Sequence, residues 1–98
     1  MMKEFIGHYC YSRAGHDSGK LYVVLYENEN EVFLSDGHLR KTDKPKKKKK
    51  KHIQIINRKA DIIEARLRED KPITDADVVN AINVYSADME VSTCQNQM

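Results

Sequence analysis

Six consecutive lysines, Lys46–Lys51, carry the most evident chemistry in this chain. Each side chain ends in a compact ammonium group that suits phosphate oxygens without reading base sequence. If about six of them each neutralise one phosphate, log K for nucleic-acid binding should fall against log salt with a slope of around −4 to −5. The alternative is a solvated, extended linker that only aids solubility, because like charges repel. For six lysines in a row we favour binding.

A polar loop at residues 12–20 is the second candidate site. Gly15 and Gly19 allow positive φ there or the close approach of another backbone. A sharp turn with exposed amides and cations can hold a phosphate backbone, although an isolated loop of this kind is more often a solvated connection. With Gly15, its candidate binding residues are Arg13, His16 and Lys20. If the two predicted β-hairpins lie side by side, Arg13, Lys20, Arg40 and Lys41 extend the surface of the lysine run, and Lys44 beside that run is a further candidate.

Catalytic and metal chemistry find little support in the residue pattern. His8, Cys10 and His16 have ligand chemistry, but structural zinc needs four ligands in short paired spacings, and no Cys-x-x-Cys occurs. Asp17 follows His16 without a nucleophile or second carboxylate, so we expect it to cap its own loop as an Asx-turn. No phosphate-loop or dinucleotide fingerprint is present. We therefore expect no enzyme activity, no metal and no cofactor.

Charge divides the chain into a basic front and an acidic back. Residues 1–55 hold twelve Lys and Arg against seven Asp and Glu, whereas residues 56–98 hold five against eight. A length of 98 residues allows one modest core. Two distant cysteines, Cys10 and Cys94, suggest no disulfide framework, and no membrane span or signal peptide is evident. We expect a soluble cytoplasmic protein with an anionic partner for its front half.

Short β-prone runs separated by turn residues predict a mostly β front half. Asp36-Gly37 predicts a two-residue hairpin turn of the primed type. The lysine-rich loop at 44–51 interrupts the pattern before the chain returns to the sheet. Such closely spaced strands indicate a small open barrel or a strongly bent sheet. The five expected strands cover residues 5–12, 21–26, 32–35, 38–41 and 52–56.

The back half changes to helical periodicity. Its apolar residues predict helices over residues 59–69 and 75–85, with Thr74 as the N-cap of the second. We expect three parts: a β unit at 1–56, the two short helices within 57–85, and a disordered tail at 86–98. The helices either cover the open end of the barrel or dock a protein partner through Val78, Val79, Ile82 and Tyr85.

An ordered set of short motifs gives the front half a family resemblance. The set comprises Gly7, residues 12–24, the Asp36-Gly37 pair, residues 39–41 and the junction at 44–46. In this order they resemble the KOW-motif family, the small SH3-like barrels of ribosomal proteins, transcription elongation factors and related RNA-binding proteins. The likeness extends to the archaeal and eukaryotic large-subunit branch and to small bacterial KOW proteins, whose helical tail is similar.

The resemblance implies a fold and a partner. The fold would be a KOW-type, SH3-like barrel of about five strands with a C-terminal helical appendage. Gly15 would match the family's central glycine in the loop that meets RNA, while His16 stands where Arg or Lys is common. The expected function is then RNA binding, with ribosomal RNA the expected ligand and ribosome or translation association implied. The alternative is an SH3-like protein-interaction module in transcription or translation, because small barrels host both functions.

Overall fold

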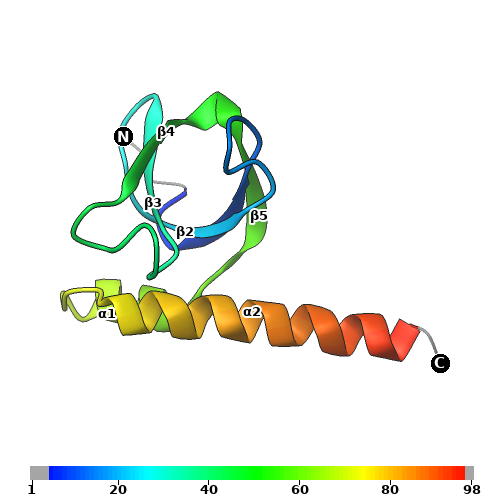
Figure 1. The fold of residues 1–98 in the computed structure, drawn as a ribbon. Coiled ribbons are helices and arrows are strands. Elements are labelled where there is room, and N and C mark those ends of the chain that lie inside the picture. Colours follow the sequence, from blue (N-terminus) through cyan, green and yellow to red (C-terminus); the bar gives the residue numbers. More distant parts are fainter. Residues whose placement is uncertain (1–4, 97–98) are drawn as a thin grey trace.

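The structure, a computed structural model, describes residues 5–96 and the side chains of residues 5–89. Its mostly β character agrees with the sequence prediction: five antiparallel strands precede two helices (Figure 1). A single 3₁₀ turn, η1 (Lys50–His52), joins the last two strands. The strands are β1 (His8–Ser12), β2 (Leu21–Glu27), β3 (Glu31–Ser35), β4 (Lys46–Lys49) and β5 (Ile53–Lys59), and the helices are α1 (Asp61–Arg68) and α2 (Asp75–Asn96).

The five strands form one strongly bent sheet in the order β4-β3-β2-β1-β5. Every neighbouring pair is antiparallel. The register shifts between His8 and Cys10 in the β1–β5 pair, and between Val24 and Tyr26 in the β2–β3 pair. Such irregularities bend a strand and increase its twist, and Figure 1 shows the sheet curling round on itself. The bend brings the lysine strand β4 within reach of the β1–β2 loop (residues 13–20).

The sheet is buried on both faces, which explains why the central strands β1 and β2 show little polar alternation. The inner, concave face holds one apolar cluster, and the outer face packs under the helices in a second. Consecutive residues therefore enter different cores: Tyr22 and Val24 point inward, while Val23 points to the helices. The full inner cluster is Cys10, Tyr22, Val24, Val32, Leu34 and Ile53, and the outer one is Tyr9, Val23, Ala60, Ile63, Val78, Ala81 and Tyr85.

The helices pack on the outer face of the sheet, and α2 runs across it (Figure 1). The Tyr9 hydroxyl donates to the Ala81 carbonyl at 2.7 Å, and the Tyr9 and Tyr85 rings lie 4.7 Å apart. Val78 and Tyr85 are buried there, and Ile82 packs against them. Residues considered for partner docking thus serve the protein's own core. The predicted N-cap is confirmed, since the Thr74 hydroxyl accepts a hydrogen bond from the Asp77 amide at 3.1 Å.

The fourth strand differs most from the sequence prediction. Residues 38–41 form no strand, and the lysine run itself supplies β4, paired with β3 from Leu34–Lys46 to Glu31–Lys49. The Asp36 carboxylate accepts hydrogen bonds from the amides of His38 and Arg40, both at 2.9 Å, so these amides are not available to a sheet. The two-residue hairpin expected at Asp36-Gly37 is therefore wrong. A longer β3–β4 loop (residues 36–45) takes its place.

The C-terminal boundaries also need correction. β5 continues to Lys59, beyond the predicted limit at residue 56, and α1 covers most of the first predicted helix. α2 continues to Asn96, whereas the sequence pattern ended it at Tyr85 and predicted disorder from Ser86 onward. That prediction is wrong for residues 86–96, and residues 97–98 lie outside the described part.

The β3–β4 loop is fixed against the start of α2. Gly37 has φ of 78°, and a Cβ there would lie 2.7 Å from both the Asp75 carbonyl oxygen and Val79 Cγ2. The Thr42 amide also donates to the Asp75 carboxylate at 2.7 Å. Only glycine satisfies both the positive φ and this close approach. The loop is therefore held at both its beginning and its middle.

Gly37→Ala should accordingly destabilise the protein more than Gly19→Ala. Both glycines have positive φ, but a Cβ on Gly19 meets no atom within 4 Å. Gly19→Ala should lower the free energy of unfolding by only about 1 kcal/mol, because alanine is strained at positive φ. The Gly37 variant should lose about 1–3 kcal/mol more, because packed backbone must move. Urea unfolding followed by circular dichroism measures both, and equal losses would show that the contact with α2 is unimportant.

Candidate nucleic-acid interface

The lysine strand has two faces because side chains alternate along a β-strand. Lys46 and Lys48 are partly covered, whereas Lys47 and Lys49 are exposed. The alternation continues through η1, where Lys50 is partly covered and Lys51 exposed. The six lysines are therefore not one uniform solvated run. Half of them turn toward carboxylates of the protein, and the outward half, Lys47, Lys49 and Lys51, remains toward solvent.

Asp17 is the partner of the inward lysines of β4. Its carboxylate is buried and lies 2.7 Å from Lys48 Nζ and 3.4 Å from Lys46 Nζ. It also accepts hydrogen bonds from the hydroxyls of Ser12 at 3.0 Å and Tyr22 at 3.2 Å. The Asx-turn expected for Asp17 is thus not what its side chain makes. The carboxylate joins the loop that carries it to β1, β2 and β4.

Lys48 makes a second contact that fixes the same loop. Its ammonium group donates to the Ala14 carbonyl oxygen at 2.6 Å, and only 9% of its side chain is exposed. Gly15 follows Ala14 with φ of 82°, a conformation that glycine adopts readily. A Cβ on Gly15 would lie 3.7 Å from Lys48 Nζ. The predicted loop and the predicted lysine run are therefore one connected structure.

Charge and hydrogen bonding keep Asp17 ionised. Burial alone would raise the pKa of this carboxyl group, but the hydrogen bonds from Lys48 and Ser12 and the charges of Lys48 and Lys46 hold it well below its usual range. Burial, and after it the charge of Asp17 and the hydrogen bond to this carboxylate, raise the pKa of the neighbouring Tyr22 hydroxyl to about 12. Tyr22 is thus a neutral donor at physiological pH.

Lys50 forms a second internal ion pair at the other end of the run. Its ammonium group lies 2.8 Å from the buried Glu27 carboxylate, whose other oxygen accepts the amides of Phe5 at 2.6 Å and Ile6 at 3.2 Å. Lys50 also lies over the Phe5 ring, 5.1 Å from its centroid. Burial opposes ionisation of Glu27, but the bonds from Lys50 and the two amides lower its pKa. Lys50 thus anchors the N-terminal segment.

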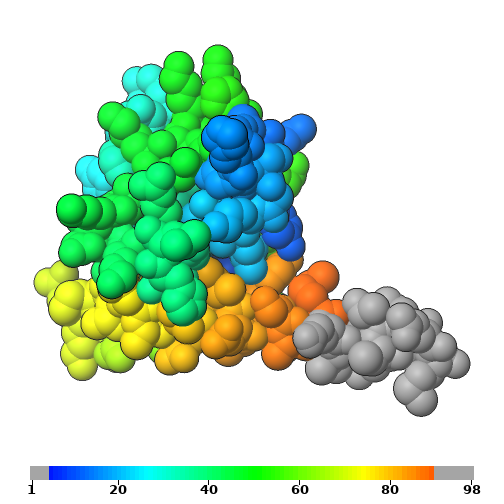
Figure 2. Space-filling model, in the orientation of Figure 1, coloured from blue at the N-terminus to red at the C-terminus, as the bar shows by residue number. Residues whose placement is uncertain are grey.

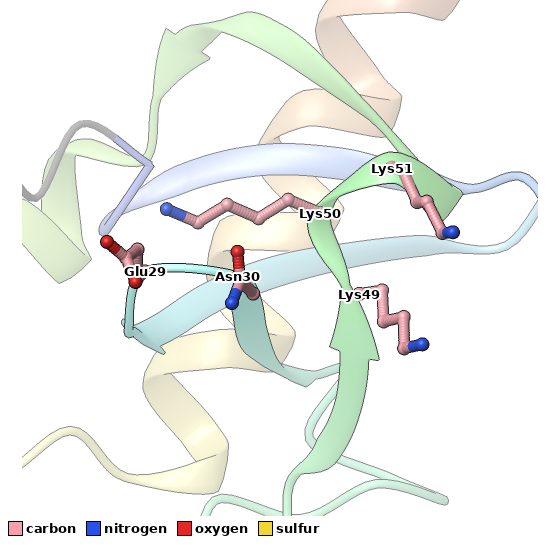
Figure 3. Close-up of a pocket in the computed structure, with 5 residues that line it drawn as sticks. All are labelled: Glu29, Asn30, Lys49, Lys50 and Lys51. Carbon is pink, nitrogen blue, oxygen red and sulfur yellow. The ribbon is translucent and has the colours of Figure 1, made fainter.

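Two of the outward lysines, Lys49 and Lys51, border a shallow hollow at the end of β4. Glu29, Asn30, Lys49, Lys50 and Lys51 line it, with a volume of about 420 Å³ (Figure 3). In Figure 3, Lys49 and Lys51 extend to one side of the strand, and Lys50 reaches to the other. Lys47 lies 4.0 Å from Glu31, but 60% of its side chain is exposed. A pair so open to water leaves the cation available to a stronger anionic partner.

A second hollow of about 350 Å³ lies where the β1–β2 and β3–β4 loops meet. It brings together three cations predicted from separate parts of the sequence, namely Lys20, Arg40 and Lys46. Lys20 and Arg40 therefore lie beside the same hollow, although the second of the two expected hairpins is replaced by the β3–β4 loop. Figure 2 shows both loops, in blue and in green, on one face of the molecule. The remaining lining residues are His16, Asp17, Tyr22 and Leu39.

Other predicted binding residues lie outside both hollows. Arg13, Lys41 and Lys44 are exposed, and the structure places none of them in the lining of either hollow. The Arg13 amide donates to the His52 carbonyl at 2.8 Å, so the start of the β1–β2 loop is fixed to η1. These three cations could widen a binding surface but do not define it.

Sequence reasoning missed the carboxylates that organise the lysines. Asp17 is the single acid of the polar loop at residues 12–20, and Glu27 directly follows the β-prone run at 21–26, and those positions were the available signal. It also missed Arg58, which pairs with Asp88 and lies over the rings of Tyr9 and Tyr85, 5.9 and 5.5 Å from their centroids. Arg58 therefore supports the packing of the helices on the sheet, which is a different role from that of the lysines in β4.

The possible metal ligands do not assemble. Cys10 is fully buried, with its thiol pKa raised to about 12 by burial, and His8 Nδ1 lies 2.9 Å from the Ile56 carbonyl oxygen. Among the side chains that the structure describes, those of residues 5–89, no group of three His, Cys, Asp or Glu could hold a metal ion. Within residues 5–96 neither helix is both long and apolar enough to cross a bilayer.

Comparison with known proteins adds no assignment. No family model matches the chain, and no curated protein matches it.

Removing the inward ammonium of Lys48 should weaken the fold, while removing its outward neighbour should not. Lys48→Met leaves the Ala14 carbonyl and one Asp17 oxygen short of a partner, which should cost about 1–3 kcal/mol. Lys47→Met removes the same charge from an exposed side chain and should change stability by less than about 0.5 kcal/mol. Urea unfolding at one ionic strength compares them. Similar losses of stability in Lys48→Met and Lys47→Met would contradict the division of β4 into an inward and an outward face.

The lowered carboxyl pKa values predict loss of stability in acid. Asp17, Glu27 and Asp77 have lower pKa values folded than unfolded, so their contribution is complete above the unfolded values of about 4. It is lost as the pH falls further toward the folded values. Asp17→Asn should therefore be less stable at pH 7 but lose less on acidification. Urea titrations between about pH 7 and pH 2.5 measure this, with exposed Asp43→Asn as the control.

Proposed function

We propose that this protein is a non-catalytic RNA-binding module that acts in the cytoplasm in association with ribosomes or translation. The supporting observation is the junction of the β1–β2 loop with β4, made by the ion pair of Asp17 with Lys48. This junction puts the outward lysines and the cations of the second hollow on connected elements. Ammonium and guanidinium groups recognise the phosphate backbone of RNA whatever its sequence. Binding would therefore follow backbone shape more than base sequence.

A KOW-type, SH3-like barrel is the fold that best accommodates these features. The sheet order β4-β3-β2-β1-β5, the bulges that bend it and the 3₁₀ turn between β4 and β5 support this proposal. In such a barrel the loop containing Gly15 would be the RNA-facing KOW loop, and structured ribosomal RNA would be the natural ligand. Gly15, His16 and Lys20 are exposed on that loop.

The division of the lysine run lowers the expected number of phosphate contacts. Lys46, Lys48 and Lys50 already neutralise carboxylates of the protein. The cations left for RNA in the two hollows and on the outward face are Lys20, Arg40, Lys47, Lys49 and Lys51. If about five phosphates are neutralised, the slope of log K against log salt should be around −3.5 to −4.5. The inward lysines contribute indirectly by holding the loop.

A protein-interaction module is the alternative function. Its proposed contacts on the helices have less support, because Val78 and Tyr85 are buried against the sheet. Val84 and Met89 are 52% and 48% exposed on α2, but single exposed apolar residues are ordinary on a protein surface. Salt dependence separates the two functions, because docking by a protein through apolar contacts would not follow the counterion relation.

Replacing the three outward lysines together, Lys47, Lys49 and Lys51, by Ser should weaken RNA binding without unfolding the protein. The salt slope should become shallower by about 2, and affinity near 0.1 M salt should fall by about 10- to 100-fold. A matched control replaces three exposed cations near α1: Lys59, Arg68 and Lys71. Fluorescence anisotropy with a ribosomal-RNA fragment and with duplex DNA, across a salt series, measures both.

The control variant defines what would contradict the proposal. It carries the same loss of charge, so a generic electrostatic effect would weaken both variants equally. Equal weakening, or binding that ignores salt in the unmodified protein, would reject the proposed RNA surface. Equal affinity for duplex DNA and RNA would instead indicate a DNA-associated barrel.

A further inference from the structure

Leu39 is an exposed leucine beside a charged hollow, and its loop is unusually well fixed. Its exposure is 77%, the highest among the large hydrophobic residues that the structure describes as exposed. It lies between His38 and Arg40 in the β3–β4 loop. A leucine side chain gives nothing to a phosphate, so any contact that Leu39 makes with RNA differs from those of the neighbouring cations.

Backbone and side-chain hydrogen bonds hold Leu39 in place. The Asp36 carboxylate accepts hydrogen bonds from the amides of His38 and Arg40, the two residues that flank Leu39. The Ser35 hydroxyl donates to the Arg40 carbonyl at 2.6 Å, and the amides of Asp36 and Gly37 reach the same carbonyl at 3.1 and 3.3 Å. Gly37 and Thr42 fix the loop to α2. A side chain presented by a loop that is already ordered loses little conformational entropy on binding.

The hollow beside Leu39 combines apolar and cationic character. Its volume of about 350 Å³ lies within the range of small-ligand sites, about 300–1,000 Å³. Lys20 and Arg40 supply two positive charges that remain for a ligand, whereas the charge of Lys46 is already paired with the Asp17 carboxylate. That carboxylate is already paired with Lys46 and Lys48, so it adds little repulsion toward an incoming anion.

We propose that this hollow takes one unpaired nucleotide of a bound RNA, and the proposal rests on the function proposed above. The base would lie against Leu39 and the flat guanidinium of Arg40, and the phosphate would lie near Lys20. Guanidinium planes stack on unpaired bases, and apolar side chains contact their faces. Bases inside a continuous duplex present no free face, so the site selects RNA with a bulge, loop or end. Tyr22 contributes little surface because its ring is buried and its hydroxyl is bound to Asp17.

The test compares an RNA hairpin carrying a single-nucleotide bulge with a fully paired, blunt-ended hairpin of equal charge, and both are closed by a non-nucleotide linker so that the bulge is the only unpaired base. The unmodified protein should bind the bulged RNA about 5- to 30-fold more tightly. Leu39→Ser should bring that ratio close to 1, while Leu39→Phe, which keeps an apolar face, should retain it. Leu67→Ser is the matched control, because Leu67 is also exposed but lies on α1. Circular dichroism verifies the fold of each variant.

The outcomes separate this proposal from the one on which it rests. Salt-dependent binding of both hairpins with a ratio near 1 would overturn the nucleotide site and leave the RNA-binding function standing. Failure to bind either hairpin at any salt would overturn both proposals. A bulge preference that survives in Leu39→Ser would place the recognition elsewhere. Adenosine monophosphate that saturates the protein as tightly as the bulged RNA would indicate a free-nucleotide site instead.

Discussion

The carboxylate of Asp17 is buried between two lysines of β4, and the position of the β1–β2 loop depends on that contact. A charge taken out of water must be compensated, and here Lys46, Lys48, Ser12 and Tyr22 all contribute. Because these partners come from three strands, one carboxylate fixes their relative placement. The loop that carries Gly15 cannot move independently of the lysine strand. Surface cations on both elements therefore keep a constant arrangement, which a phosphate backbone can match without ordering them first.

The lysine run acts in two ways because a strand has two faces. Inward lysines neutralise the buried carboxylates Asp17 and Glu27, and outward lysines stay in water. An edge strand carrying lysines also resists pairing with other sheets, which protects the free edge of β4. Stability and the proposed binding thus draw on alternate residues of one segment. This division explains why the composition of the segment overstates the charge available to a ligand.

The sequence was informative where residue periodicity is strong. β-branched and aromatic residues predicted β2 nearly to its ends, and the Thr74 cap predicted the start of α2. β4 was missed because lysine has low strand propensity, and its pairing with β3 is supported by the tertiary contact of Lys48 with the buried Asp17. Residues 38–41 were misread because Asp36 forms a local Asx-turn in place of the expected hairpin, and because the packing of Gly37 on α2 depends on residues distant in sequence. The candidate binding residues could be named from the sequence, but their separation into inward and outward sets required the fold.

The most direct test of the proposed interface is a nuclear magnetic resonance titration of the ¹⁵N-labelled full chain with a ribosomal-RNA fragment. If RNA binds at this interface, changes in amide chemical shift should concentrate in the β1–β2 loop, in the β3–β4 loop around Arg40 and along Lys47–Lys51. Amides on the exposed side of α1 and α2 should change little. Chemical-shift changes that concentrate on α2, or the absence of any change at saturating RNA, would contradict the proposed interface.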